Sequence, residues 1–288
     1  MHSCFQDIFV TCDDHQEVQY EGTRHGNHWG NGVLRMSNGR TYARVHGGVP
    51  LFVPPEQDPW DDEVVGLSKN WRNSARRLPQ AKYNSWIERI VAQGGLILIV
   101  ACGPGGSHSR PILSLNPEAR LIMNDIGKWI VVEWKRFAEE KGIWPYLSCA
   151  QFDARCFPIR DGCLDCVDSS GAMVEINPSF PAMSEAFRVL KPGGKLFLSE
   201  GMLDPECIRQ FPEEARQELY DIQFNLCSTD YRERLTALGF KIIPYEQSGH
   251  TTPNLGESTL ANMSTKYGVE IRMFGVTIEA QKPLDISD

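Results

Sequence analysis

The sequence predicts an α/β fold built on a doubly wound sheet. From residue 96 onward, short apolar runs alternate with longer segments whose apolar side chains recur every three or four positions, the pattern of strands alternating with helices. The first run, residues 96–100, is entirely apolar, as expected for a strand covered on both faces. A glycine-rich turn follows it at residues 103–106. In such a sheet the ligand binds beyond the carboxyl ends of the central strands, so functional residues are expected directly after each strand.

Seven strands and four helices are predicted after residue 83. The strands, which are mainly aliphatic runs between turn residues, are predicted at residues 96–100, 121–125, 147–152, 164–167, 195–199, 240–245 and 269–280. The helices, which carry apolar side chains on one face, are predicted at residues 84–92, 130–141, 181–190 and 215–238. The helix at 181–190 is expected to stop before Lys191-Pro192-Gly193-Gly194, because proline and glycine end helices.

The first 94 residues have a different character. Five of the seven histidines lie in residues 1–53, and residues 33–36 and 41–45 alternate around Asn38-Gly39 like the two strands of a β-hairpin. A proline-rich, acidic stretch follows at residues 54–63. We therefore predict a small β-rich N-terminal segment at 1–53, a linker with lead-in helices at 54–94, and the main domain at 95–288.

Composition and charge narrow the class of protein. A chain of 288 residues with 41% apolar side chains is long enough to bury a core without disulfides or a structural metal. Its 29 basic and 37 acidic residues give a net charge of −8, and an acidic surface disfavours nucleic acid and anionic membranes as partners. Most of the nine cysteines lie in apolar runs, and the longest such run is far below the roughly 20 residues of a membrane helix. We expect a cytoplasmic protein with reduced thiols, without a leader peptide or membrane anchor.

Three strand ends carry residues suited to an adenosine. Gly103 and Gly105 in the first turn let the backbone bend sharply and approach a ligand. Asp125 closes the second strand about 20 residues later, where a carboxylate can accept both hydroxyls of a ribose. Asp153 closes the third strand and Ala154 follows it, an arrangement suited to the amine and the ring of adenine. Each aspartate alone is typical of a helix N-cap, but the three strand ends together predict one adenosine site.

These strand ends resemble successive motifs of class I S-adenosylmethionine-dependent methyltransferases, most closely those of the ubiquinone/menaquinone-biosynthesis type (methyltransferase type 11). The segments that carry the resemblance are residues 98–105, 124–125, 153–158, 164–167 and 187–194, of which the Leu-Lys-Pro-Gly-Gly turn is the most specific. The resemblance implies a Rossmann-like, seven-stranded sheet whose last two strands form an antiparallel hairpin, and a methyltransferase domain at 95–288. It also implies S-adenosylmethionine as the cofactor and S-adenosylhomocysteine as the product.

The resemblance assigns roles to residues at these strand ends. Asp125 would bind the ribose, Asp153 the adenine amine and Ala154 the adenine ring. Ser169 or Ser170, after the fourth strand, would face the sulfonium and the substrate. The cofactor-binding residues that the resemblance implies are Ala101, Cys102, Gly103, Pro104, Gly105, Asp125, Ile126, Asp153, Ala154, Ser169 and Ser170.

The chain departs from the family pattern at two positions of the first motif. Ile99 stands where the family usually has an acidic residue that helps to hold the methionine ammonium, and Ala101 stands where it usually has glycine. These departures favour weaker cofactor binding. They motivate one alternative, a non-catalytic methyltransferase-fold subunit that regulates a partner.

Methyl transfer from an activated sulfonium depends mainly on positioning, which can supply roughly 7–11 kcal/mol of the barrier. A general base adds roughly 10²–10⁴-fold where the acceptor must lose a proton. We predict His250 or Tyr245 as the catalytic base. His250 lies in a loop after a late strand, and an ordinary histidine pKa of about 6.5 suits base chemistry. The further candidates near the expected mouth of the site are His108, Glu175 and Tyr231.

The N-terminal histidines and cysteines form a loose zinc pattern. Cys12-x-x-His15 and His25-x-x-His28 have permissive spacing, and residues 39–52 resemble the end of a zinc-ribbon-like module that precedes some methyltransferases. Such modules use Cys-x-x-Cys pairs, which this chain lacks before residue 163, so we predict a metal-free relic, with zinc as the less favoured option. The module motivates a second alternative, an rRNA or tRNA base methyltransferase, for which residues 72–77 offer a compact basic stretch.

Our first hypothesis is therefore a cytoplasmic S-adenosylmethionine-dependent methyltransferase that acts on a small-molecule acceptor. Its expected partner is that small molecule, and a homodimer is compatible with the sequence. Neither a membrane nor a nucleic acid is expected. The RNA methyltransferase and the regulatory subunit are the two alternatives.

Overall fold

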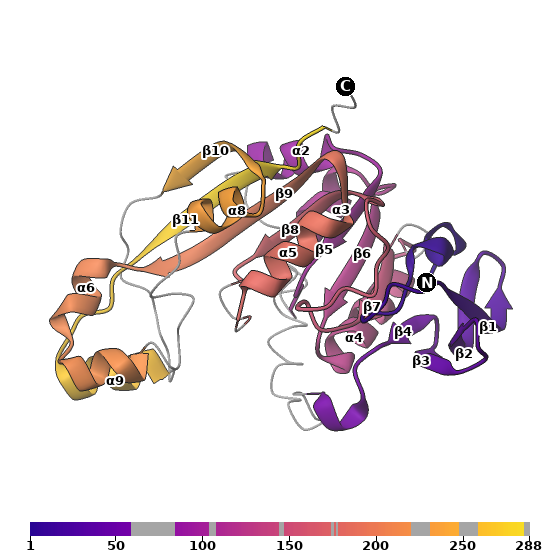
Figure 1. The fold of residues 1–288 in the computed structure, drawn as a ribbon, viewed down its shortest axis with the longest axis horizontal. Coiled ribbons are helices and arrows are strands. Elements are labelled where there is room, and N and C mark those ends of the chain that lie inside the picture. The colour runs from indigo at the N-terminus through magenta and orange to yellow at the C-terminus, as the bar shows by residue number, and fades with distance from the viewer. Residues whose placement is uncertain are drawn as a thin grey trace.

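One mixed sheet of eleven strands runs through the chain (Figure 1). The computed structural model describes residues 1–58, 84–103, 108–143, 147–173, 176, 178–219, 231–247 and 259–284. The strands of the main part are β5 (Leu96–Ile99), β6 (Arg120–Asp125), β7 (Leu147–Gln151), β8 (Leu164–Ser170), β9 (Leu190–Leu203), β10 (Lys241–Gln247) and β11 (Met273–Gln281).

The order of these strands is β7-β6-β5-β8-β9-β11-β10. The strands from β7 to β9 are parallel, whereas β11 pairs antiparallel with both β9 and β10. The prediction of a doubly wound, Rossmann-like sheet with an antiparallel last hairpin is thereby confirmed. From β5 the chain first moves to β6 and β7 on one side, and then to β8 and β9 on the other. The strand order therefore reverses between β5 and β8, which places the expected binding crevice at their carboxyl ends.

Four N-terminal strands extend the sheet past β7. They are β1 (Val18–His25), β2 (His28–Met36), β3 (Thr41–His46) and β4 (Val49–Leu51), and the short 3-10 helices η1 (Ser3–Ile8) and η2 (Pro55–Gln57) flank them. β2 and β3 form the predicted hairpin, with Gly39 in its turn at a φ of 82°, which glycine adopts readily. β4 pairs in parallel with β7 through Leu51 and Gln151, and the N–H of Phe52 donates to the carbonyl of Gln151. Residues 52–58 consequently lie beside the carboxyl end of β7.

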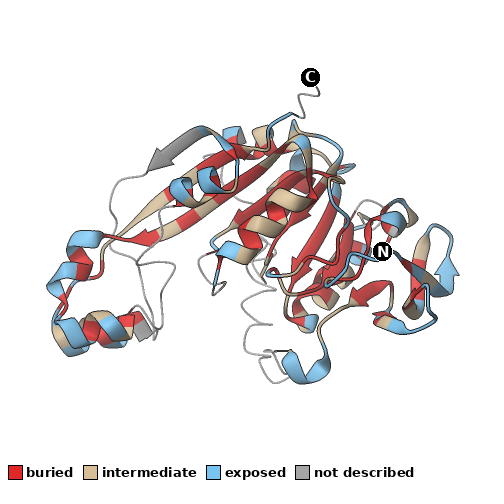
Figure 2. Ribbon diagram, viewed as in Figure 1, coloured by how far each residue is buried: buried red, intermediate tan, exposed pale blue. Residues whose placement is uncertain are grey.

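Helices cover both faces of the main sheet. One face carries α2 (Asn84–Val91), α3 (Ser109–Leu115) and α4 (Lys128–Glu140), and the other carries α5 (Phe180–Val189) and α8 (Tyr231–Ala237). Ile87 of α2 and Trp134 of α4 are buried against the first face, and Met183 of α5 and Leu235 of α8 against the second. Figure 2 shows the central strands buried between these layers, which explains why residues 96–100 are all apolar.

Several boundaries differ from those expected. β8 continues to Ser170, and β9 begins at Leu190, directly after α5. The turn at residues 191–194 does end the helix, but it is also part of the sheet. The N–H of Gly193 donates to the carbonyl of Lys282, and the N–H of Lys282 donates to the carbonyl of Gly194, each at 2.9 Å. Of the helix predicted at 215–238, residues 213–219 and α8 are helical, and residues 220–230 lie outside the described part.

Three short helices were not predicted from the sequence. α3, α6 (Pro205–Gln210) and α9 (Thr259–Tyr267) have only six to nine residues, too few to establish an apolar periodicity. α6 and α9 lie beyond the far ends of β9 and β11, away from the N-terminal strands (Figure 1). None of the described helices has both the length and the apolar character that are required to span a bilayer.

Candidate functional site

The turn after β5 has the backbone of a glycine-rich loop. Ala101 has a φ of 46° and Gly103 a φ of 55°, both in the left-handed region. Glycine adopts this region without strain, whereas alanine does so at a cost. The N–H of Cys102 donates to the carbonyl of Asn124 at 2.8 Å, so the turn also folds back onto the end of β6. Pro104 and Gly105, which the sequence places in the same loop, lie outside the described residues.

Asp125 connects this loop to the start of α4. Its Oδ2 accepts a hydrogen bond from the N–H of Gly103 at 2.9 Å, and its Oδ1 accepts one from the N–H of Gly127 at 3.0 Å. Burial raises the pKa of Asp125, and these backbone hydrogen bonds oppose that rise. A carboxylate has about four lone-pair positions, so Asp125 can accept two further donors, such as a pair of hydroxyls. Ile126 follows it and is half-buried.

Asn124 and Trp134 were not predicted as site residues, yet both hold the loop. The buried amide of Asn124 donates to the carbonyl of Phe152 at 2.9 Å and accepts from the N–H of Ala101 at 3.3 Å. Trp134 lies in the helix predicted at residues 130–141, and its indole nitrogen donates to the carbonyl of Gly103 at 2.9 Å. The signal in the sequence was a polar side chain at a buried strand position, next to Asp125.

Asp153 and Ala154 follow β7, as predicted. Ala154 is buried, and the carboxylate of Asp153 is bound by Arg155, whose Nη2 lies 2.6 Å from Oδ2. Burial raises the pKa of Asp153, but the hydrogen bonds and the charge of Arg155 lower it by more, so the net shift is downward. The carboxylate is therefore ionised and already has one partner. An adenine amine would have to share it with Arg155.

The end of β8 carries both predicted serines, within the strand and not after it. Ser169 is buried, and its Oγ has no hydrogen-bond partner in the described part of the chain. Ser170 is half-buried. Asp168 directly precedes them in β8, and it was not predicted as a site residue from the sequence. The imidazole Nδ1 of His108 lies 2.9 and 3.0 Å from its two carboxylate oxygens.

The candidate bases differ in whether the structure describes them and leaves them accessible. His108 is only 3% exposed and is engaged with Asp168, so it is not available to an acceptor molecule, and Tyr231 is buried in the core. Tyr245 pairs with Ile278 in the sheet, but its side chain is not described. His250 and Glu175 lie outside the described residues.

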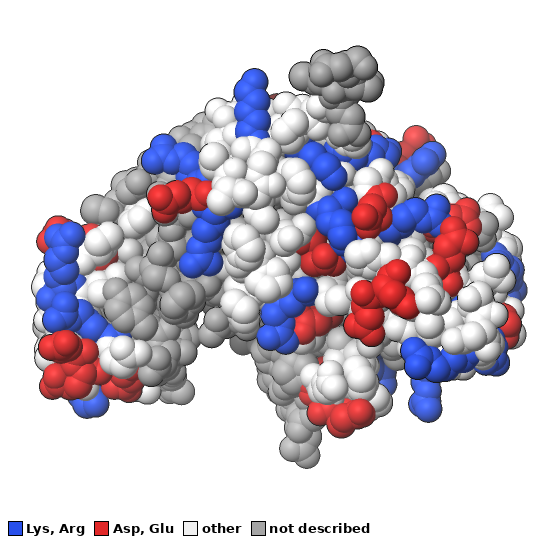
Figure 3. All heavy atoms as spheres, viewed as in Figure 1, with Lys and Arg blue, Asp and Glu red and all other residues white. Residues whose placement is uncertain are grey.

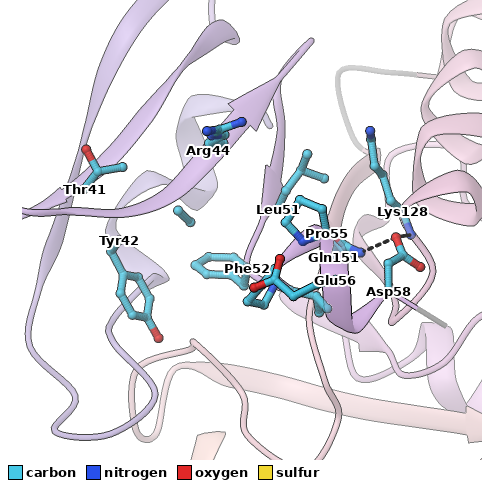
Figure 4. A pocket seen from close by; sticks show the side chains of 13 residues that line it. Thr41, Tyr42, Arg44, Leu51, Phe52, Pro55, Glu56, Asp58, Lys128 and Gln151 are labelled. Carbon is cyan, nitrogen blue, oxygen red and sulfur yellow. Dashed lines mark hydrogen bonds between the residues drawn. The ribbon is translucent and has the colours of Figure 1, made fainter.

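Two cavities border the carboxyl edge of the sheet on the β7 side. The smaller has a volume of about 250 Å³, and its walls include Ile126, Asp153 and, from the lead-in segment, Val53 and Pro54. The larger has a volume of about 710 Å³ and lies between β3, residues 51–58 and the start of α4 (Figure 4). The two share residues 52–54 and Tyr42 as walls, so the N-terminal segment helps to shape both.

Asp58 fastens the lead-in segment to this edge. Its Oδ2 accepts from the backbone N–H of Lys128 at 3.1 Å and from the side-chain amide of Gln151 at 2.9 Å, as Figure 4 shows. The same amide donates to the carbonyl of Ile126 at 2.9 Å. The segment that precedes the main domain is thereby coupled to the residue that follows Asp125.

A metal site is not apparent at the N-terminus. Within the ranges that the structure describes, no three His, Cys, Asp or Glu side chains gather closely enough to hold an ion. Of the cysteines expected there, Cys12 instead donates from its thiol to the carbonyl of Cys156 at 3.1 Å.

Comparisons with known proteins agree with this geometry. A family profile described as a methyltransferase domain matches residues 97–194. The ubiquinone/menaquinone biosynthesis C-methyltransferase UbiE of Roseobacter denitrificans is 25% identical over 197 residues, which are 68% of this chain and 71% of that protein. The protein of the same name from Dinoroseobacter shibae is 26% identical over 208 residues, or 72% of this chain and 75% of that protein.

A solved structure shares the fold. Geranyl diphosphate C-methyltransferase from Streptomyces coelicolor A3(2), in complex with Mg²⁺, geranyl diphosphate and S-adenosylhomocysteine, has a TM-score of 0.53 and 16% identity, covering 78% of this chain and 84% of that chain. The profile match lies within the part of the chain that carries β5, the glycine turn and Asp125. The chain is thus similar to methyltransferases in sequence, over about two thirds of its length in the named relatives, and in fold.

Proposed function

We propose that the carboxyl edge of β5 to β8 binds S-adenosylmethionine and that the enzyme transfers its methyl group to a small-molecule acceptor. The observation that carries the proposal is the position of Asp125. Its buried carboxylate links Gly103 to the start of α4 and retains acceptor positions for ribose hydroxyls. We assign the parts of the cofactor to the described residues on either side of it.

The adenosine end is assigned to the β7 side of Asp125. The smaller cavity there has Ile126 and Asp153 in its walls, and the buried Ala154 lies next to Asp153 in the chain. The methionine end is assigned to the β8 side. Residues 101–103, which follow β5, and Ser169 and Ser170, at the end of β8, lie there on neighbouring strands. The hydroxyl of Ser169, buried without a partner among the described residues, is suited to a polar group of the ligand.

The chemistry requires little of the protein beyond positioning. S-adenosylmethionine supplies an activated methyl group, which an acceptor atom displaces in line while the thioether departs. The chain's part is to hold the two reacting atoms at contact distance and to exclude water. Where the acceptor loses a proton, His250 or Tyr245 is proposed to receive it. The relatives named for C-methylation favour carbon as the acceptor atom.

A small molecule is preferred to RNA as the substrate. The chain carries a net charge of −8, and on the face seen in Figure 3 basic side chains are interspersed with acidic ones. A phosphate backbone needs clustered basic side chains, so this surface offers it little attraction. The basic residues 72–77 lie outside the described part.

The cofactor assignment is tested by calorimetric titration with S-adenosylmethionine and S-adenosylhomocysteine. Asp125→Asn keeps the side chain's size but removes its charge and one acceptor oxygen. We expect it to weaken binding about 10- to 100-fold, since a hydrogen bond to a charged group contributes about 1.5–3 kcal/mol. Asp161→Asn is the matched control, because Asp161 is exposed and pairs with Arg188 before the amino end of β8. Absence of binding by the unmodified protein would refute the proposal.

The substrate class is tested by transfer of a labelled methyl group. Incubation with a small-molecule extract or with total RNA, followed by separation by size, shows which fraction becomes labelled. Label in the small-molecule fraction supports the proposal, and label in RNA replaces it with the RNA alternative. Binding of the cofactor without label in either fraction, together with label-free protein, would favour the regulatory subunit.

A further inference from the structure

Asp168 contacts the chain on both sides of the loop at residues 101–107, called the loop below. The backbone carbonyl of Asp168 accepts from the N–H of Val100 at 2.9 Å, where the chain leaves β5. The carboxylate of the same residue binds His108 at 2.9 and 3.0 Å, where the chain enters α3. The two contacts to Asp168 are therefore made by Val100 and His108, the residues that precede and follow positions 101–107 of the chain.

The side-chain contact is specific, because the pair lies in an apolar environment. The side chains of His108 and Asp168 are 3% and 0% exposed. In the sheet, Asp168 stands between Ile99 of β5 and Phe197 of β9, neither of which can compensate its charge. A carboxylate buried in this way requires a positively charged or donating partner, and His108 supplies it.

We propose that Asp168 and His108 form a positioning pair that sets the loop in the shape required by the methionine end of the cofactor. This inference rests on the proposed function. Both carboxylate oxygens of Asp168 already face Nδ1 of His108, so we assign the pair a role through the loop and not through contact with the ligand. Their action is to fix the start of α3 against β8, and thus the distance that the loop has to span.

The pair should affect one end of the ligand and not the other. Asp125, Asp153 and Ile126, which are assigned to the adenosine, lie at the ends of β6 and β7, whereas Asp168 lies in β8, on the other side of β5. 5′-Methylthioadenosine contains the adenosine and lacks the amino-acid end, whereas S-adenosylhomocysteine contains both. The two probes therefore separate a defect in the loop from a general loss of structure.

The variants follow from the atoms in contact. Asp168→Asn keeps the backbone bond to Val100 and removes the charge and one acceptor oxygen of the side chain. His108→Ala removes the donor, whereas His108→Asn is the conservative variant, because the asparagine amide stands close to the place of Nδ1. Glu279→Gln is the matched control, since Glu279 is also a buried carboxylate, bound to Lys195 and Arg89 away from the loop.

The experiment measures the dissociation constants of both probes for each variant, with thermal melting as a check of folding. We expect Asp168→Asn and His108→Ala to raise the dissociation constant of S-adenosylhomocysteine about 10-fold or more, or roughly 1.4 kcal/mol. Methylthioadenosine should bind as it does to the unmodified protein, His108→Asn should recover most of the lost affinity, and Glu279→Gln should lower only the melting temperature.

Two results would overturn the inference while the proposed function stands. In the first, the unmodified protein binds both probes and the variants bind S-adenosylhomocysteine equally well. In the second, the variants lose both probes in equal measure, which indicates a general structural role. If the unmodified protein binds neither probe, the proposed function itself fails and the inference falls with it.

Discussion

The indole nitrogen of Trp134 donates a hydrogen bond to the carbonyl oxygen of Gly103 at 2.9 Å. Trp134 lies in the middle of α4, and the start of that helix is bound through the N–H of Gly127 to Asp125, which also binds the N–H of Gly103. Gly103 is thus held through both its N–H and its carbonyl. The loop and the helix that follows β6 form one unit. A change in the buried face of α4 should therefore alter the affinity of the proposed cofactor site.

Trp134→Phe should lower the free energy of unfolding and weaken the binding of the cofactor. It leaves the carbonyl of Gly103 without the indole donor, which costs about 1–3 kcal/mol for a buried group. Urea unfolding and calorimetry with S-adenosylhomocysteine measure the two effects. Trp86→Phe is the control, because Trp86 is also buried in a helix on this face, and its indole nitrogen has no hydrogen-bond partner among the described residues. Equal losses in the two variants would contradict the role given to the hydrogen bond.

Ala101→Gly should stabilise the fold. Ala101 has a φ of 46°, and the left-handed conformation costs about 1–2 kcal/mol for a residue with a Cβ. Glycine relieves this strain but costs about 0.4–1 kcal/mol through the greater entropy of the unfolded chain, so the net gain lies between about 0 and 1.6 kcal/mol. In Ala138→Gly, in the buried interior of α4, the same exchange should instead lower the free energy of unfolding by at least about 0.5 kcal/mol. Denaturant unfolding decides the sign at each position.

The His108–Asp168 pair should make stability depend on pH. Burial lowers the pKa of His108, but the charge and hydrogen bond of Asp168 raise it above the unfolded value of 6.5. The folded state therefore binds the proton more tightly. The contribution of the pair is fully present below about pH 6.5, and it is lost as the pH rises through the folded pKa.

Asp168→Asn should reverse this dependence. Without the carboxylate, burial alone acts on His108 and holds its pKa below 6.5, so the variant loses stability as the pH falls instead. The measurement is the difference in unfolding free energy between the two proteins from pH 5.5 to 9, in which other groups cancel, including the buried Met1 amine, whose pKa is lowered to about 5. A difference that is constant with pH would show that His108 does not change its protonation with folding.

Asp58→Ala should weaken cofactor binding although Asp58 is not assigned to the ligand. The substitution removes the acceptor that fastens residues 52–58 to Lys128 and Gln151, and with it one wall of the smaller cavity. A loss of about 1 kcal/mol corresponds to about a fivefold higher dissociation constant. Asp58→Asn, which keeps an acceptor oxygen, should lie close to the unmodified protein. Affinity that is unchanged in both variants would exclude the lead-in segment from the site.

The sheet could be predicted because it follows from local patterns. Each signal occupies only a few consecutive residues: the apolar run at 96–100, the glycine turn after it, and the aspartates at the ends of β6 and β7. Parallel sheets bring such strand ends together at one edge. Three helices of six to nine residues, α3, α6 and α9, were not predicted, since helices this short give only a weak periodicity, although α2 was predicted from its apolar face.

The residues that hold the site together depend on partners far apart in the chain. His108 and Asp168 are 60 residues apart, and Trp134 and Gly103 are 31 apart. In the sequence a lone histidine, an aspartate inside a strand and a helical tryptophan each have an ordinary explanation. Only the packing of α3 and α4 on the sheet brings them into contact, and burial then makes each contact specific, because a polar group without a partner is costly there.

The sequence by itself determined the alternation of strands and longer helices from residue 96 onward, and it led to the expectation of a ligand edge at the carboxyl ends of the strands. Local hydrophobic period and turn chemistry suffice for that. The tertiary structure decided that the N-terminal strands extend the sheet through Leu51 and Gln151, that Asp153 is held by Arg155, and that Asp168 pairs with His108 at the start of α3. These features are pairings across space, and their free energy comes from desolvation in a folded core, which no single segment of the chain contains.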